Sequence, residues 1–176
     1  MNEPLLDIAA LFARSSVGYA VIGGHAVNAW LEPRFTADID VTVVATPDEL
    51  ARLLAVLQSA GYDVERQLGA EQPSGPDFIR LRSSAGSVLE IQPAKTELQR
   101  ELVRRAERQG GPVATATVED LLILKLIAWR SKDRIDLEGL ARLDGVDWAY
   151  VRRWCDSWEI GDRLSALRTL VGLPPL

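Results

Sequence analysis

The sequence is poor in the residues that build disulfide frameworks and zinc sites. It contains one cysteine, Cys155, and one histidine, His25, among 176 residues. A single cysteine excludes an internal disulfide, and these counts are too low for the usual Cys/His zinc sites. A serine or cysteine triad would need His25, and no other feature points to one. We interpret Cys155 as a buried structural thiol, and its solitary occurrence fits a reducing, cytoplasmic compartment.

Long apolar runs and an excess of basic residues are also missing. The longest apolar stretch, residues 121–129, is interrupted by Lys125. It is shorter than the roughly 18 to 20 residues of a membrane helix, so we expect no membrane partner. Residues 1–4 lack the basic region of a signal peptide. The formal net charge of -5 argues against a general polyanion binder, although local basic patches are compatible with it.

The patterns along the chain predict a mixed α/β core followed by helices. The hydrophobic fraction of 47% and the charged fraction of 26% are ordinary for a globular protein. Helical periodicity and capping signals predict helices at 4–14, 25–30, 48–60 and, strongly charged and exposed, at 95–108. Apolar alternation predicts strands at 18–22 and 38–44, two or three strands at roughly 62–66, 77–82 and 86–92, and a short strand at 113–116, with a loop at 69–76. We therefore expect a core over 1–116 and a helical portion over 117–176, with breaks near Lys132, Gly145 and Gly161, packed on that core.

Two carboxylates recur at two-residue spacing in the strand predicted at 38–44. Alternate strand residues point to the same face, so Asp38 and Asp40 are aimed together while Ile39 and Val41 face the other way. Repulsion between like charges this close is relieved by a divalent cation. Carboxylate oxygens suit magnesium, which retains waters and recruits substrate phosphates. The pattern by itself is common and also fits a solvated strand face.

A glycine pair precedes these carboxylates. Gly23 and Gly24 follow the strand at 18–22 and open a helix, and thirteen residues separate Gly24 from Asp38. A glycine-rich turn at a helix N-terminus lets backbone N–H groups approach phosphates closely. An ordinary tight turn would also contain such a glycine pair. The pair indicates a phosphate site only in combination with the carboxylates that follow at Asp38 and Asp40.

The strand, glycine pair, short helix and Asp-x-Asp strand together resemble the nucleotidyltransferase (polymerase-beta-like) superfamily. Residues 23–27 (GGHAV) and 34–40 (RFTADID) look especially like AbiEii-like toxin nucleotidyltransferases and related bacterial proteins. Segments 119–125 and 128–137 are also similar to that group, and the resemblance spans most of residues 19–140. It implies an α/β (α+β) fold, with a nucleotidyltransferase-type mixed sheet flanked by helices.

The superfamily implies a third carboxylate on a later strand. Glu90, within the strand predicted at 86–92, is the best candidate, and Asp77 is the fallback. A carboxylate in an apolar strand is costly without a partner, whereas an edge-strand residue facing water would carry no such cost. The family more often has Asp here, and Glu is one methylene longer. The resemblance thus implies that Asp38, Asp40 and Glu90 are the catalytic and metal-binding residues.

The resemblance also implies a set of nucleotide-binding residues. Arg34 and Thr36 match the family's Arg-x-Thr before the Asp pair, and loop solvation and turn capping explain them equally well. Lys125 interrupts an apolar helix, where it either snorkels to solvent or reaches a triphosphate. The cost of burying an unpaired charge favours the triphosphate. Gly23 and Gly24 complete the predicted set.

Charged residues follow Lys125 in the predicted C-terminal helices. They belong to the segment that resembles the family, but they equally fit an exposed ion-pair cluster. These residues are Arg130, Lys132, Asp133 and Asp136.

The resemblance implies a reaction that depends on Mg²⁺ or Mn²⁺. A nucleoside monophosphate would move from a nucleoside triphosphate (NTP) to an RNA, protein or small-molecule acceptor. Asp38 and Asp40 would hold the ions that bridge the phosphates, while Glu90 would help hold the second ion and accept the acceptor's proton. A toxin role would add a cognate antitoxin as partner. Two alternatives remain: a non-catalytic binding module with this fold, and a drug-modifying nucleotidyltransferase of the aminoglycoside or lincosamide kind.

Overall fold

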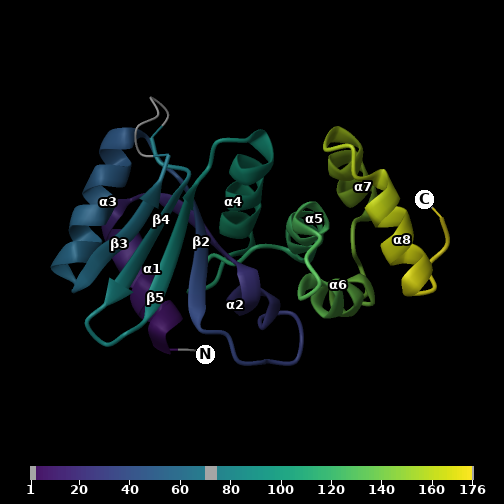
Figure 1. Cartoon of the computed structure of the whole chain (residues 1–176), viewed down its shortest axis with the longest axis horizontal. Helices are drawn as coiled ribbons and strands as arrows, with labels where there is room; N and C mark the ends of the chain where they lie inside the picture. The colour runs from purple at the N-terminus through teal and green to yellow at the C-terminus, as the bar shows by residue number, and fades with distance from the viewer. Residues whose placement is uncertain (1–2, 70–74, 176) are drawn as a thin grey trace. The chain divides into compact units, whose positions relative to one another are not determined.

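The protein is described by a computed structural model that covers residues 3–69 and 75–175 and divides into two compact units (Figure 1). The first unit takes residues 1–26 and 34–116, and the second takes 27–33 and 117–176. The chain passes from one unit to the other at Ala116–Thr117, where the sequence pattern changes from mixed to helical. Residues 27–33 belong to the helical unit, which the sequence patterns did not predict. The packing of the helical portion on the core stays a prediction.

Within the described residues, five strands of the first unit form one mixed sheet. The strands are β1 (Gly18–Ile22), β2 (Asp38–Val44), β3 (Tyr62–Leu68), β4 (Phe78–Ser83) and β5 (Val88–Pro93). Their order in the sheet is β1-β2-β5-β4-β3. β2 and β5 are parallel and the other neighbours are antiparallel. The predicted fold class and these five predicted strands are confirmed, and β1 and β2 have the predicted bounds.

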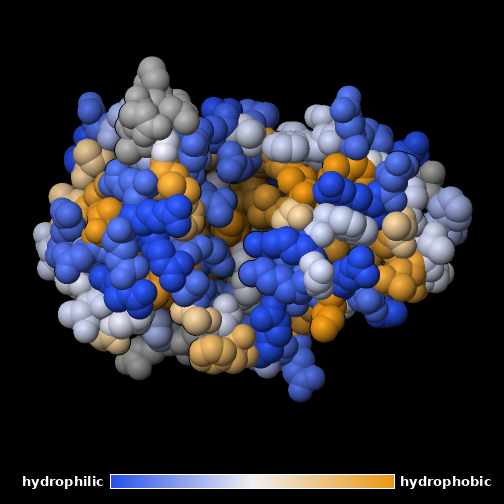
Figure 2. All heavy atoms as spheres, in the orientation of Figure 1, coloured by the Kyte–Doolittle hydropathy of each residue, from blue (hydrophilic) through white to orange (hydrophobic). Residues whose placement is uncertain are grey.

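Two-residue alternation gives this sheet an apolar and a polar face. The apolar face includes Ile39, Val41, Leu81, Leu89 and Ile91, all buried. Their neighbours on β2, β4 and β5 point the other way and include Asp38, Asp40, Arg80 and Glu90. Figure 2 shows hydrophilic residues gathered over β3 and β4 on the face turned to the viewer. Burying one face fixes the strand register, since a slip of one residue would exchange the two faces.

The helices of the first unit flank the sheet, and α1 lies behind it in Figure 1. They are α1 (Glu3–Ser15), α2 (Gly23–Val27), α3 (Pro47–Ser59) and α4 (Glu97–Gln109). A capping box between Thr46 and Glu49 sets the start of α3. The helix predicted at 25–30 is shorter and ends at Val27.

Two predictions for the first unit are wrong in detail. The helix predicted at 95–108 is α4, and it is not fully exposed. One of its faces is buried, because apolar side chains recur every three or four residues among its charged ones. These side chains are Leu98, Leu102, Val103 and Ala106. The strand predicted at 113–116 forms only an isolated bridge between Thr115 and Val21. The loop predicted at 69–76 lies partly outside the described residues.

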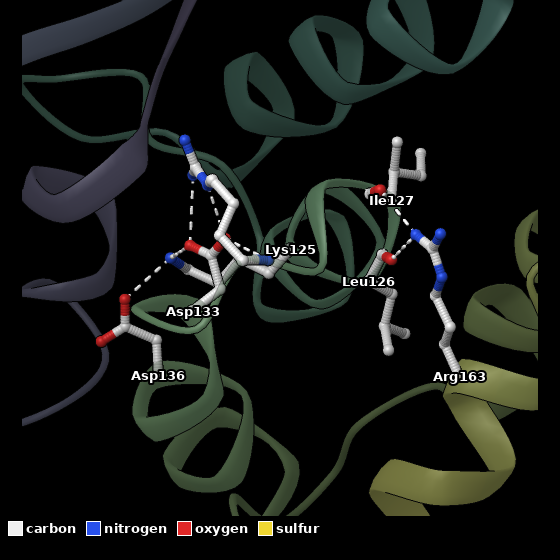
Figure 3. Close-up of polar contacts among 7 residues, drawn as sticks. Lys125, Leu126, Ile127, Asp133, Asp136 and Arg163 are labelled. Carbon is white, nitrogen blue, oxygen red and sulfur yellow. Dashed lines mark hydrogen bonds and ion pairs between the residues drawn. The ribbon is translucent and has the colours of Figure 1, made fainter.

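The second unit is built from α5 (Val118–Ala128), α6 (Asp133–Ala141), α7 (Trp148–Ser157) and α8 (Gly161–Leu170). The predicted breaks near Lys132, Gly145 and Gly161 fall at or beside the ends of these helices. Thr117 caps α5, and its side chain accepts a hydrogen bond from the Asp120 backbone. At the other end of α5, Arg163 donates to the carbonyls of Leu126 and Ile127 at 2.9 and 2.7 Å (Figure 3). None of the described helices is long and apolar enough to span a membrane.

Candidate active site

The parallel pairing of β2 with β5 brings the predicted carboxylates to one face. Asp40 and Glu90 are directly paired in register, and Asp38 lies two residues before Asp40. Paired residues of neighbouring strands point the same way, so all three side chains leave the polar face. The Asp38 and Glu90 side chains are 38% and 17% exposed, respectively. We call Asp38, Asp40 and Glu90 the carboxylate site.

The glycine turn lies directly against the carboxylate site. Gly23 has a φ of +62°, and a Cβ atom there would lie 2.0 Å from Asp40 Oδ2. A Cβ atom on Gly24 would lie 2.7 Å from Thr36 Oγ1. The absence of side chains at both glycines therefore lets the turn pack against Asp40 and Thr36. Of the predicted nucleotide-binding residues, the structure brings Gly23, Gly24 and Thr36 together with Asp40.

Arg80 on β4 is a residue of this site that the sequence analysis missed. It is paired in register with Glu90, and its Nη1 atom contacts Glu90 Oε1. The same Nη1 atom lies 3.6 Å from Asp38 Oδ2, and Nε lies 3.4 Å from Glu65 Oε2. The available signal was the Arg80-x-Arg82 alternation, which places both arginines on one face. Its meaning depends on β4 lying next to β5, which local sequence does not reveal.

Magnesium is the metal that the resemblance implies, and the donor chemistry of the site fits it. Asp38, Asp40 and Glu90 offer hard carboxylate oxygens from two adjacent strands on one face. Over residues 3–69 and 75–175, no group of three Asp, Glu, His or Cys side chains already stands in a metal-binding arrangement. The Arg80 guanidinium contacts two of the carboxylates instead. The assignment of Asp38, Asp40 and Glu90 as metal ligands stays a prediction.

Other predicted residues of the first unit lie elsewhere. Asp77, the fallback for Glu90, is exposed just before β4 and contacts the ammonium of Lys95. Arg34 is exposed in the segment between α2 and β2, and its nucleotide role stays a prediction. Partial burial lowers the pKa of His25 below its ordinary value, so the imidazole is neutral at pH 7.

Lys125 lies in the second unit, where two aspartates hold it. It is 7% exposed, and its Nζ atom lies 2.7 Å from Asp136 Oδ2 and 3.3 Å from Asp133 Oδ1 (Figure 3). The interpretation that Lys125 snorkels to solvent is wrong, because its ammonium is buried and the two carboxylates offset the cost of desolvating it. The triphosphate role of Lys125 stays a prediction.

The interpretation of an exposed ion-pair cluster is wrong for two of its members. Asp133 and Asp136 are buried, while Arg130 and Lys132 are exposed. Arg130 Nε donates to Asp133 Oδ2 at 2.7 Å. Burial alone would raise the pKa of Asp133, but hydrogen bonds from Arg130 and the charge of Lys125 outweigh it and lower that pKa. Asp133 is therefore a buried anion at neutral pH.

A mixed sheet with a glycine turn packed against an Asp-x-Asp strand defines a nucleotidyltransferase fold. The model of the family described as "Nucleotidyl transferase AbiEii toxin, Type IV TA system" matches residues 9–153. The chain belongs to this AbiEii family of nucleotidyltransferases, and the protein is an enzyme of that class.

Solved structures support the fold. A lincosamide antibiotic adenylyltransferase, LnuA, with lincomycin bound is 19% identical and has a TM-score of 0.55, covering 81% of this chain and 98% of that one. An antigenic nucleotidyltransferase-like protein from Paracoccidioides brasiliensis is 18% identical with a TM-score of 0.53, covering 94% and 90% of the two chains. At these identities the likeness concerns the fold. No curated protein matches the sequence.

Proposed function

We propose that the protein transfers a nucleoside monophosphate from a nucleoside triphosphate to an RNA, protein or small-molecule acceptor with the help of magnesium or manganese. The observation that carries this proposal is the register of β2 and β5, which pairs Asp40 with Glu90 and sets Asp38 on the same face. Three carboxylates on one face, beside a glycine turn, offer hard ligands for divalent ions that bind phosphates.

In the proposed reaction an acceptor oxygen attacks the α-phosphorus of the nucleoside triphosphate. A bond forms between that oxygen and the α-phosphorus. The bond between the α-phosphorus and the oxygen that bridges the α- and β-phosphates breaks, and pyrophosphate leaves. Glu90 accepts the proton of the acceptor hydroxyl, while Asp38 and Asp40 would hold the metal through their anionic oxygens. When bound, the metal ions would stabilise charge on the attacking and leaving oxygens. The backbone at Gly23 and Gly24 would approach the phosphates.

Two further features guide the choice of acceptor. The description of the family as a toxin of a type IV toxin–antitoxin system favours a toxin role with a cognate antitoxin as partner. The likeness to a lincosamide adenylyltransferase concerns the fold and leaves a drug-modifying role as a second candidate. The intact Asp-x-Asp and glycine turn favour either enzyme over a non-catalytic binding module.

Ligand binding and acceptor labelling test the proposal in sequence. Magnesium with a nucleoside triphosphate should raise the melting temperature, because a ligand that binds only the native state stabilises it. The double variant Asp38→Asn/Asp40→Asn should lose that shift. The double variant Asp63→Asn/Asp144→Asn removes the same charge from two exposed positions and should keep it. An undiminished shift in the first variant would mean that the nucleotide binds elsewhere.

The acceptor is then sought with four labelled triphosphates, magnesium, total RNA, total protein, and aminoglycoside and lincosamide drugs. Label on RNA or protein, together with an antitoxin gene beside this one, would support the toxin role. Label on a drug would support the second candidate. Wild-type protein that binds nucleotide but labels nothing in these pools would put the binding module ahead.

A further inference from the structure

Arg80 connects the strands of the polar face through its guanidinium. It lies between β5 and β3, on β4, and contacts carboxylates on three neighbouring strands. Nη1 contacts Glu90 on β5 and lies 3.6 Å from Asp38 on β2, while Nε lies 3.4 Å from Glu65 on β3. One cation thus reaches two of the three predicted metal ligands.

The position of Glu65 follows from an irregularity in the sheet. The register of β3 against β4 shifts between Val64 and Arg66, so Glu65 is an extra residue at a bulge. Glu65 also accepts hydrogen bonds from Arg82, and these hold the pKa of its carboxyl below the ordinary value. Glu65 is therefore a lasting anion on the side of Arg80 away from the carboxylate site.

A guanidinium and a divalent ion compete for the same oxygen lone pairs. Arg remains charged at all physiological pH values and presents a planar fork that contacts two carboxylates together. Its charge offsets the repulsion among Asp38, Asp40 and Glu90, which is also what a bound divalent ion does. Arg80 Nη1 contacts Oε1 of Glu90 and lies near Oδ2 of Asp38, so a metal that binds these carboxylates competes with the guanidinium for their negative charge.

We infer that Arg80 is a positioning residue that acts as an internal counter-cation, competing with the divalent ion for Asp38 and Glu90 and shifting toward Glu65 when the ion binds. This inference rests on the proposed function, since it takes Asp38 and Glu90 as metal ligands. Arg80 lowers the affinity of the empty site for metal and keeps the carboxylates in place without it. Loading of the ion is then favoured when the phosphates of a nucleotide add their own oxygens as ligands.

The first test measures Mn²⁺ binding in the absence of nucleotide, by electron paramagnetic resonance of the free ion. Arg80→Gln should bind Mn²⁺ about tenfold more tightly than wild type, a moderate effect because partly exposed charges are screened. Arg82→Gln is the matched control. Within the described residues the direct contacts of Arg82 are with Glu65 and Gly86, and its charge acts on Asp38 only from a longer distance, so its effect should stay smaller, within about twofold. Asp38→Asn/Asp40→Asn should abolish the site.

A second measurement separates competition from a purely structural role. Apo Arg80→Gln should melt at a lower temperature than wild type, because the carboxylates lose their counter-cation. Mn²⁺ should then raise the melting temperature of Arg80→Gln by more than it raises that of wild type. Arg80→Lys keeps the charge but lacks the fork, so its Mn²⁺ affinity should fall between the two. It also provides a folded comparison if Arg80→Gln is too unstable.

The possible results distinguish this inference from the proposed function. Tighter Mn²⁺ binding in Arg80→Gln that depends on Asp38 and Asp40 supports both. Equal Mn²⁺ affinity in wild type, Arg80→Gln and Arg80→Lys overturns the inference and leaves the metal site standing. Weaker nucleotide binding in Arg80→Gln with unchanged Mn²⁺ affinity would make Arg80 a phosphate ligand, which also overturns it. Mn²⁺ binding that survives Asp38→Asn/Asp40→Asn would overturn both.

Discussion

Gly23 and Asp40 lie so close that a Cβ atom added to Gly23 would fall 2.0 Å from Asp40 Oδ2. This contact joins the two motifs that stood thirteen residues apart in the sequence. Glycine is needed at position 23 for two reasons: a side chain would clash with Asp40, and the backbone φ of +62° disfavours other residues. The glycine turn and the carboxylate site are therefore one packed structure.

Replacing Gly23 with alanine should reveal both effects. The variant must adopt a left-handed backbone and displace Asp40, so it should lose about 3 kcal/mol of unfolding free energy and most nucleotidyl transfer. Gly86→Ala is the matched control, with a φ of +88° and nothing within 4 Å of the added Cβ. It should cost about 1 kcal/mol and leave transfer intact. Urea unfolding measures the free energy of unfolding of both variants, and a transfer assay measures their activity. Equal losses of unfolding free energy in the two variants would mean that the contact with Asp40 costs nothing.

Glu90→Gln should lower the rate of transfer more than the affinity for nucleotide. The amide keeps the size of the side chain but is a far weaker base, so kcat should fall by about 100-fold or more if Glu90 takes the acceptor's proton. Nucleotide affinity should change much less, because Asp38 and Asp40 remain. Glu65→Gln removes a carboxylate that Arg80 contacts outside the carboxylate site and should leave kcat within a few-fold. Equal losses in rate and nucleotide affinity would make Glu90 a ligand only, without the proton role.

Local sequence was sufficient for the Asp-x-Asp strand but not for its surroundings. The two-residue period of a strand placed Asp38 and Asp40 on one face without knowledge of the neighbours. Glu90 was placed through family resemblance, and only the β2–β5 pairing shows why it faces the same way. Arg80 could not be identified, because its contacts come from strands whose order is set by long-range packing.

The second unit shows the same limit. Periodicity predicted that Lys125 lies in an apolar helix, and its charge then had no visible partner. Asp133 and Asp136 become its partners because α6 folds back on α5 after a left-handed residue at Trp129. A left-handed backbone is not typical of tryptophan, so this turn could not be predicted from the residue type.

Lys125→Met should destabilise the protein strongly. It removes the ammonium from between two buried carboxylates, and breaking a buried pair in this way costs about 3 to 5 kcal/mol. Adding Asp136→Asn should recover part of that loss, since it removes one uncompensated charge. Lys132→Met, at an exposed neighbouring position, should stay within about 0.5 kcal/mol of wild type.

Chemical unfolding of wild type, Lys125→Met, Lys125→Met/Asp136→Asn and Lys132→Met measures these differences in the free energy of unfolding. A Lys125→Met variant as stable as wild type would show that the ion pairs contribute nothing. The folded double variant also tests the triphosphate prediction, because its nucleotide affinity should fall if Lys125 contacts the triphosphate.

The lowered pKa of Asp133 predicts how stability depends on pH. A folded pKa below the ordinary value of 3.8 means that the native state binds fewer protons than the unfolded chain in that range. The contribution of Asp133 is therefore fully present above the ordinary value and is lost as the pH falls through the folded pKa. The stability difference between wild type and Asp133→Asn should thus be large at about pH 6 and shrink as the pH falls below the ordinary value of 3.8. Arg130→Gln removes the hydrogen bonds that lower this pKa, so in that background the contribution should be smaller and its loss should be complete at a higher pH. Urea unfolding across this range measures the effect, and a difference between wild type and Asp133→Asn that is the same at both ends would show that the folded and unfolded pKa values are equal.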